Sequence, residues 1–164
     1  MIRLKHVLVA TDFSETSEAA LRYGRDLART FGAKLHVLHV VDNILMRYAF
    51  DGSVVLPPEA QAELEHVAQT HLEQLLGDDD RRELGAVAVL RTANTPADSI
   101  VDYAKAAGID VIVIGTHGRR ALEHLLLGSV AEHVVRTSPC PVLTVRHPER
   151  EFLVPDALVS AAKA

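Results

Sequence analysis

Three glycines in the second half of the chain have a spacing that could cradle phosphate groups. Gly115 and Gly118 are separated by two residues, and a further nine residues separate Gly118 from Gly128, which is followed directly by Ser129. Glycine lets a backbone turn tightly and approach a ligand closely, so that amide hydrogens can point at an anion. If a helix starts at Gly128, the amides of Ser129 and Val130 lack intrahelical partners and attract phosphate.

Two arginines strengthen this interpretation, although each glycine also has a structural alternative. Arg119 and Arg120 bring positive charge to the segment. Gly115 could simply follow a buried strand, and Gly128 could allow a helix to contact a strand or could be tolerated inside a helix at about 1 kcal/mol. The spacing differs from a P-loop, which needs Lys-Ser or Lys-Thr after its last glycine, and from the dinucleotide fingerprint. Taken together, the glycines, Ser129 and the arginines favour a phosphate cradle.

An acidic residue stands at a second strand end. Ala10, Thr11 and Asp12 close the first predicted strand, as Ile114 and Gly115 close the fourth. Open parallel sheets bind ligands outside the carboxyl ends of their strands, where the strand order reverses. Asp12 could therefore contact a ligand, cap the following helix in a capping-box pattern with Glu15, or do both.

Short β-branched runs alternate with longer helical patterns along the chain. Strands are predicted over residues 6–10, 35–41, 86–90, 110–114 and 142–145. Helices are predicted from about 14 to 31, from 57 to 76, from 94 to 108, and from the glycine-containing loop to about 137, with a loop over 42–56 and a solvated turn over 78–82. Such alternation predicts an α/β fold, a three-layer sandwich with a five-stranded parallel sheet and helices on both faces.

Composition narrows the class of protein. A length of 164 residues predicts one domain, and 48% hydrophobic with 24% charged residues is ordinary for a globular chain. The charge, 17 − 22 = −5, disfavours a dedicated nucleic-acid-binding protein, and no apolar run is long enough to span a membrane. No signal peptide is seen and the single cysteine, Cys140, cannot form an internal disulfide, so a cytoplasmic location is expected.

Other reactive residue types suggest no further chemistry. Cys140 lies between two prolines at a strand entrance and is expected to be a small buried hydrophobe rather than a nucleophile. No histidines have zinc-ligand spacing, and His36 and His39 should point to opposite faces of their strand.

The segment from Gly115 to Val130, with its complete G-x2-G-x9-G-[ST] spacing, resembles the nucleotide signature of the universal stress protein family, ATP-binding subclass. Residues 9–14 and 138–145 are similar to that family's first strand and last strand. The resemblance covers about residues 3–146. It suggests a nucleotide-binding domain over 1–146 and a C-terminal extension over 147–164, to which nothing is carried over.

The resemblance implies a strand order of 3-2-1-4-5 and a set of roles. Asp12 would hold the ribose hydroxyls, and the backbone of Val41 would meet the adenine edge, although Val41 is a core residue in most sheets. His117 could instead be a solvated loop residue. The cofactor-binding residues expected at the strand ends, the phosphate loop and the phosphate-binding helix start are Ala10, Thr11, Asp12, Val41, Ile114, Gly115, His117, Gly118, Arg119, Gly128, Ser129 and Val130.

The expected function is that of a stress-response regulatory protein that binds ATP, AMP or ADP, with Mg²⁺ arriving on the phosphates. Asp12 is the only acid at the strand ends near the cradle, so at most weak hydrolysis is expected. The alternative is a slow ATPase or nucleotidyl-transfer enzyme using the same pocket. A phosphorylation-switch receiver is disfavoured, because the third strand ends in Leu90-Arg91-Thr92 and the fifth at Arg146.

The last strand predicts how the chain assembles. In the implied order it lies at an edge of the sheet, and an apolar edge invites pairing with another chain. The resemblance likewise implies a homodimer through the fifth strand, residues Val142, Leu143, Thr144 and Val145.

Overall fold

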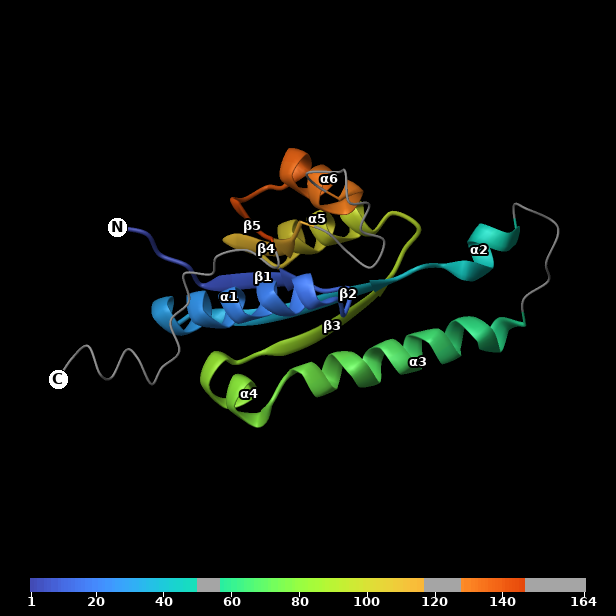
Figure 1. Cartoon of the computed structure of the whole chain (residues 1–164), viewed down its shortest axis with the longest axis horizontal. Helices are drawn as coiled ribbons and strands as arrows, with labels where there is room; N and C mark the ends of the chain where they lie inside the picture. Colours follow the sequence, from blue (N-terminus) through green and yellow to red (C-terminus); the bar gives the residue numbers. More distant parts are fainter. Residues whose placement is uncertain (50–56, 117–127, 147–164) are drawn as a thin grey trace.

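The computed structural model describes residues 1–49, 57–116 and 128–146 and contains one parallel sheet. Its order is β3-β2-β1-β4-β5, which confirms the predicted fold class and topology (Figure 1). The strands are β1 (His6–Ala10), β2 (Lys34–Val41), β3 (Val87–Thr92), β4 (Val111–Gly115) and β5 (Val142–Val145). Every neighbouring pair of strands is parallel.

Helices cover both faces of the sheet (Figure 1). One face packs against α1 (Glu15–Phe31), α3 (Pro58–Leu75) and α4 (Asp78–Leu84), and the other against α5 (Pro96–Ala106) and α6 (Ser129–Thr137). The short helix α2 (Ile44–Ala49) follows β2 and contacts α3. None of the helices in the described ranges is long and apolar enough to cross a membrane.

Each central strand contributes to two separate hydrophobic clusters. Val7 and Val9 of β1 belong to the cluster under α1, whereas Leu8 and Ala10 belong to the cluster under α5 and α6. Successive side chains of a strand point to opposite faces, so a strand that is covered on both faces is apolar throughout. This explains the continuous apolar runs in the sequence.

The start of α1 is fixed by two side chains acting in sequence. Ser14 is the N-cap, and its Oγ accepts a hydrogen bond from the amide of Ser17 at 3.3 Å. The Asp12 carboxylate lies before the helix and accepts from the Ser14 amide at 3.1 Å and from its hydroxyl at 2.5 Å. Asp12 therefore orients the cap instead of capping the helix itself, and the predicted capping box with Glu15 is replaced by this relay. Phe13, between the two, has a φ of 64°, a left-handed conformation that only a tight local turn maintains.

The prediction of a solvated turn over 78–82 is wrong. These residues belong to α4, and Asp80 within it is only 5% exposed. Its carboxylate accepts hydrogen bonds from the Arg25 side chain of α1 at 2.8–3.1 Å and from the Gly77 amide at 3.3 Å. A run of aspartates looks hydrated in sequence, but a guanidinium from a distant helix compensates the burial of this one. The predicted loop over 42–56 likewise contains α2 in its described part.

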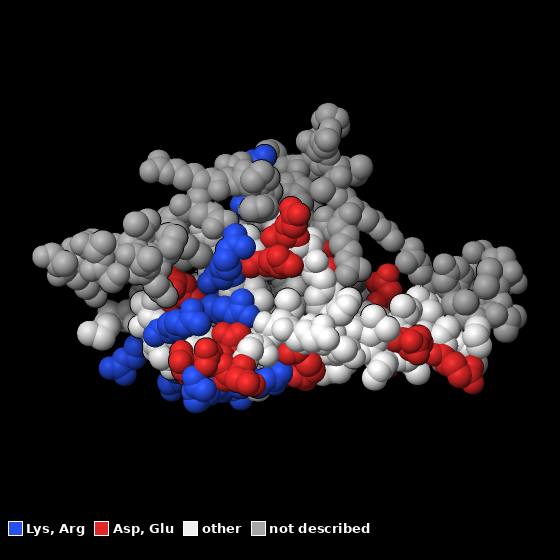
Figure 2. Space-filling model, turned by 60° about the horizontal axis from the view of Figure 1, so that its bottom comes forward, with Lys and Arg blue, Asp and Glu red and all other residues white. Residues whose placement is uncertain are grey.

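Other charged side chains of α3 and α4 lie at the surface. Figure 2 shows basic and acidic residues intermixed on this side of the molecule, where Arg81 pairs with Glu73 and Arg82 with Asp79. Such exposed pairs contribute little to stability.

The amino end of the sheet is closed by polar contacts between its own residues. Asp110, just before β4, accepts hydrogen bonds from the amides of Lys5 at 2.6 Å and His6 at 2.9 Å. His36 of β2 is bonded through Nδ1 to the Tyr103 hydroxyl at 2.7 Å and through Nε2 to His6 Nδ1 at 3.2 Å. The polar groups of this end are thus paired with one another.

Candidate functional site

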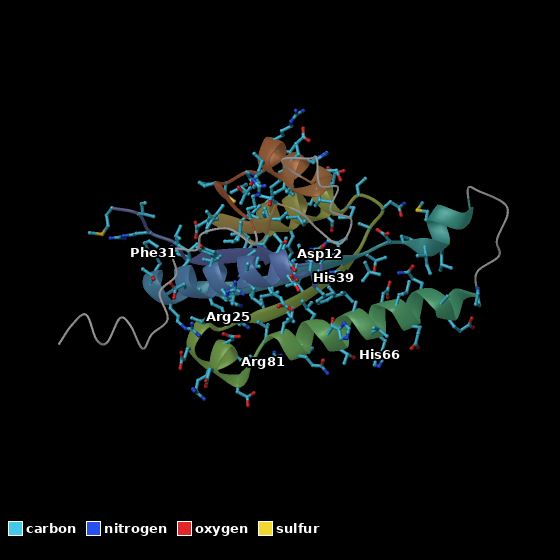
Figure 3. The ribbon with its side chains drawn as sticks, viewed as in Figure 1. Asp12, Arg25, Phe31, His39, His66 and Arg81 are labelled. Atoms are coloured by element: carbon cyan, nitrogen blue, oxygen red, sulfur yellow. The ribbon has the colours of Figure 1, made fainter. Side chains whose placement is uncertain are left out.

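A cavity of about 460 Å³ lies at the carboxyl ends of β1, β2 and β4. Its walls come from these strand ends, from the first residues of α5 and α6, and from Ser17 of α1. Figure 3 shows two of the lining residues, Asp12 and His39, close together where β1 leads into α1. The position is the one that the sheet order predicts, because β2 and β4 flank β1 and the chain leaves them in opposite directions.

Most of the described residues that the sequence singled out meet in this cavity. His117, Gly118 and Arg119 lie outside the described residues. The predicted residues that line the cavity are Ala10, Thr11, Asp12, Ile114, Gly115, Gly128, Ser129 and Val130.

Val41 does not line the cavity, whereas its neighbours Val40 and Asp42 do. The Val41 carbonyl accepts a hydrogen bond from the amide of Ala93 at 3.0 Å, and the Val41 side chain is buried. Backbone groups of successive strand residues point to opposite sides, so those of Val40 point towards β1. Strand β1 ends at Ala10, and the Thr11 amide that follows it donates a hydrogen bond to the Leu38 carbonyl of β2 at 2.9 Å. The Val40 amide and carbonyl lie beyond this last backbone hydrogen bond between the two strands.

The start of α6 presents backbone amides at the cavity. Gly128 is the N-cap, with φ −68° and ψ 150°, and as a glycine it brings no side chain of its own to cap the helix. The first hydrogen bond of the helix is donated by Glu132 to the Gly128 carbonyl, so the amides of Ser129, Val130 and Ala131 have no partner within the helix. All three residues line the cavity. Of the two alternatives left open by the sequence, the structure has Gly128 as the N-cap from which α6 starts.

The glycine at the end of β4 has a packing role. A methyl group on Gly115 would lie 2.9 Å from the Thr16 Cγ2 atom and 3.2–3.3 Å from the Thr16 backbone. The absence of a side chain therefore lets α1 approach the end of β4. This close approach brings Asp12 and the start of α6 to the same cavity.

Hydroxyl groups join the end of β1 to α1. The Thr11 and Ser17 hydroxyls are 3.0 Å apart, and Thr11 Oγ1 also accepts from the Phe13 amide at 3.1 Å. The His39 ring donates from Nδ1 to the Thr11 carbonyl at 2.8 Å and packs against the Phe13 ring, with centroids 4.3 Å apart and the planes tilted by 40°. His36 is bonded on the other face of the sheet, which confirms that the two histidines of β2 point to opposite faces.

Sequence reasoning missed half of the cavity wall. The remaining lining residues are Ser17, Leu38, His39, Val40, Asp42, Pro96, Ile100, Thr116 and Ala131. Side-chain alternation along β2 would have separated Val40 from Val41. The apolar lining residues of α5 and α6 could be assigned to the cavity from the helix patterns only once it is known that both helices cover the same face of the sheet.

Other reactive groups are the metal-ligating side chains and the Cys140 thiol. Within residues 1–49, 57–116 and 128–146, no group of three or more His, Cys, Asp or Glu side chains is placed to hold a metal ion. Cys140 packs half-buried against the cluster beneath α5 and α6, and burial raises the pKa of its thiol, which disfavours the nucleophilic thiolate.

Comparison with known proteins agrees with the fold. The protein MJ0531 of Methanocaldococcus jannaschii, named a universal stress protein, is 32% identical over 158 residues, which cover 90% of this chain and 85% of that protein. The solved structure of MJ0577 from the same organism has a TM-score of 0.71 at 29% identity, covering 93% of this chain and all of that one.

A second solved structure is similar in fold alone. It is the universal stress protein from Archaeoglobus fulgidus in complex with dAMP, with a TM-score of 0.52 at 24% identity, covering 88% of this chain and 99% of that one. The family model described as the universal stress protein family matches residues 3–146. With that match over most of its length, the chain belongs to the universal stress protein family.

Proposed function

We propose that this chain is a regulatory protein that binds an adenine nucleotide in the cavity at the carboxyl ends of β1, β2 and β4. The observation that carries the proposal is the start of α6, where three backbone amides without helical partners belong to residues of the cavity wall. A helix N-terminus of this kind binds phosphate through its amides and its dipole.

The two helices that begin at the cavity differ in how they begin. Helix α5 starts with Pro96, which has no amide hydrogen, whereas α6 starts with Gly128 and Ser129. Helix α6 therefore offers phosphate one more donor than α5 does, and the Ser129 hydroxyl adds another. The phosphates are assigned to α6 on this ground.

The base is assigned to the end of β2. The Val40 amide and carbonyl lie beyond the end of β1 at the cavity wall, and form a donor beside an acceptor. Adenine carries the complementary pair, a ring nitrogen that accepts and an amino group that donates. Guanine reverses both groups, so ATP should bind more tightly than GTP. Leu38 and Ile100 supply apolar walls for a ring.

The sugar is assigned to Asp12, whose carboxylate can accept hydrogen bonds from ribose hydroxyls at the same cavity. Mg²⁺ would enter on the phosphates and neutralise part of their charge. A protein of the same fold was solved with dAMP, but at 24% identity that likeness concerns the fold, so the proposal rests on the residues of this chain.

A substitution at the first residue of α6 tests the phosphate assignment. Proline is well tolerated at this position, and the extended conformation of Gly128 suits a following proline. Ser129→Pro removes one amide donor and the hydroxyl, whereas Ser129→Ala removes the hydroxyl alone. Titration calorimetry should show ATP affinity lowered about tenfold or more in the proline variant, as expected for a lost charge-assisted hydrogen bond.

The matched control is Ser129→Ala, which keeps all three amides at the start of α6 and should lose less ATP affinity than Ser129→Pro. A Ser129→Pro variant that binds ATP like the wild type would overturn the phosphate assignment. Denaturing the purified protein and identifying any released nucleotide, together with titrations of ATP and GTP, tests the nucleotide class itself. No binding of ATP at millimolar concentration would remove the proposal.

The alternative, a slow ATPase or nucleotidyl-transfer enzyme using the same pocket, is favoured only by the presence of Asp12 at the cavity. It requires turnover above background that is lost in Asp12→Ala. Measuring phosphate release from both proteins separates the two functions.

We also propose a homodimer through β5 and a cytoplasmic location. Strand β5 is an edge of the sheet, and the Val145 carbonyl bonds the Thr116 amide, so by alternation the backbone of Thr144 points outwards. Thr144→Pro removes an outward amide without breaking a bond to β4. Light scattering should give a dimer for the wild type and a monomer for this variant, and a monomeric wild type would refute the assembly.

A further inference from the structure

We propose that Asp98 and His133 form a positioning pair that holds the phosphate-binding start of α6 in place against α5. The inference rests on the proposed function, because it concerns the affinity of the same cavity. It adds two residues that do not line the cavity and that the sequence analysis did not single out.

The pair joins the first turn of α5 to the second turn of α6. His133 Nε2 lies 2.8 Å from Asp98 Oδ1. Asp98 stands between Pro96 and Ile100, which both line the cavity, and His133 follows the lining residue Ala131 by two positions. Each partner is thus within one helical turn of the cavity wall.

The contact beneath the pair does not by itself fix the helices along their axes. It is made of small and branched apolar residues, among them Ala97, Val101, Ala131 and Val134, all buried in one cluster. Apolar burial has no preferred direction, and the small alanine side chains protrude too little to stop one helix from sliding along the other. A hydrogen bond depends steeply on distance and angle, so the pair Asp98–His133 sets the register of the two helix starts.

If Asp98 and His133 act by positioning, removing them should change the affinity for ATP more than the stability of the fold. The two side chains are 51% and 48% exposed, and an exposed pair of this kind contributes little to folding. Phosphate binding by backbone amides, in contrast, depends on their placement to a fraction of an ångström. Loss of the pair should therefore lower the affinity for phosphates while leaving the fold intact.

An electrostatic role predicts the opposite sign for one variant. The Asp98 carboxylate stands near the start of α5, close to where the phosphates are assigned. If it acted only through its negative charge, removing it would relieve repulsion and strengthen ATP binding. If it positions α6, removing it weakens ATP binding.

The experiment compares ATP and adenosine affinities by calorimetry for the wild type, Asp98→Ala, His133→Ala, the double variant and Asp98→Asn. Each alanine variant should bind ATP about two- to fivefold more weakly, and the double variant should be no weaker than either single variant. Asp98→Asn keeps an acceptor for His133 and should bind like the wild type. Adenosine affinity should not change, because adenosine carries no phosphate.

Arg136→Ala is the matched control, since it breaks another exposed pair on α6, Arg136–Glu132 at 2.9 Å, that involves no second helix. It should leave ATP affinity unchanged, and all variants should melt within about 3 °C of the wild type. Wild-type ATP binding with unaltered or stronger binding by Asp98→Ala would overturn this inference alone. A wild type that does not bind ATP would overturn the proposed function as well.

Discussion

The two ends of the sheet carry similar polar residues but use them differently. At the amino end, Asp110 takes up two backbone amides, and His36 is bonded to both Tyr103 and His6. At the carboxyl end, Asp12 also holds its neighbours, but it does so beside a cavity of about 460 Å³. Residue type alone does not distinguish the two ends.

The difference arises where backbone groups lie beyond the strand ladder or before the first hydrogen bond of a helix. The loop before β4 closes the amino end by placing a carboxylate against amides. Strand β1 ends at Ala10, opposite Leu38, while β2 continues to Val41, and the N-cap of α6 is a glycine. Buried backbone groups must find partners, so an open end of this kind is suited to a ligand that supplies them. The comparison predicts that substitutions at the amino end change stability and those at the carboxyl end change affinity.

The largest effect on stability is expected at Asp80, which lies with α4 on the side of the amino end. Asp80→Ala leaves the partly buried Arg25 guanidinium without its carboxylate and should lower the free energy of unfolding by about 3 kcal/mol or more. Urea unfolding measures this loss. Asp79→Ala is the control, because its exposed pair with Arg82 should change stability by less than about 0.5 kcal/mol.

A loss below about 1 kcal/mol in Asp80→Ala would show that the pair does not anchor α4 to α1. Reduced ATP affinity in the folded variant would break the proposed separation between the two ends.

The next largest effect is on the stability of the protein at acidic pH. Burial, then the nearby His6 and Lys34, lowers the pKa of His36 from 6.5 to about 4. The unfolded chain protonates this residue below pH 6.5 while the folded chain does not, so the unfolded state binds more protons. Stability therefore falls as the pH drops from 6.5 towards 4, by about 3 kcal/mol when the drop is complete.

His36→Gln should flatten this part of the pH dependence in urea unfolding between pH 7.5 and pH 4. Carboxylates contribute in the same range, so the quantity to compare is the difference between wild type and variant. His66→Gln, an exposed position on α3, is the control and should leave the curve as it is in the wild type (Figure 3). Equal slopes for all three proteins would contradict the expected role of His36.

The smallest of the stability effects is expected at Gly115, at the carboxyl end. Gly115→Ala places a methyl group 2.9 Å from Thr16 Cγ2, so α1 must shift, at about 1–3 kcal/mol. Because α1 carries the cap that Asp12 holds, ATP affinity should fall as well. Thermal unfolding and calorimetry measure the two losses, and Gly77→Ala, with no atom within 4 Å of the added carbon, is the control.

Gly115→Ala thus sharpens the comparison between the two ends of the sheet, since it should lower stability and ATP affinity together. A variant with wild-type stability and affinity would mean that the contact with Thr16 is easily relieved.

The parts of this molecule that could be predicted from sequence are those set by nearby residues. The apolar runs of β1 and β4 and the end of α1 at Phe31 depend on local patterns. The start of α6 after Gly128 was one of two alternatives that the sequence left open. Helix α4 could not be predicted, because the partner of Asp80 lies 55 residues away in the chain. Val40 was not distinguished from Val41, because their roles depend on where a neighbouring strand ends.

One hydrogen bond connects the residue that follows β4 to the start of α6. The Gly128 amide donates to the Thr116 carbonyl at 2.6 Å, although residues 117–127 separate them in the chain. At this point of the cavity rim, the end of β4 and the start of α6 are therefore joined by main-chain atoms that every amino acid possesses. Because no side chain takes part in it, substitutions between Thr116 and Gly128 leave the atoms that form this junction in place.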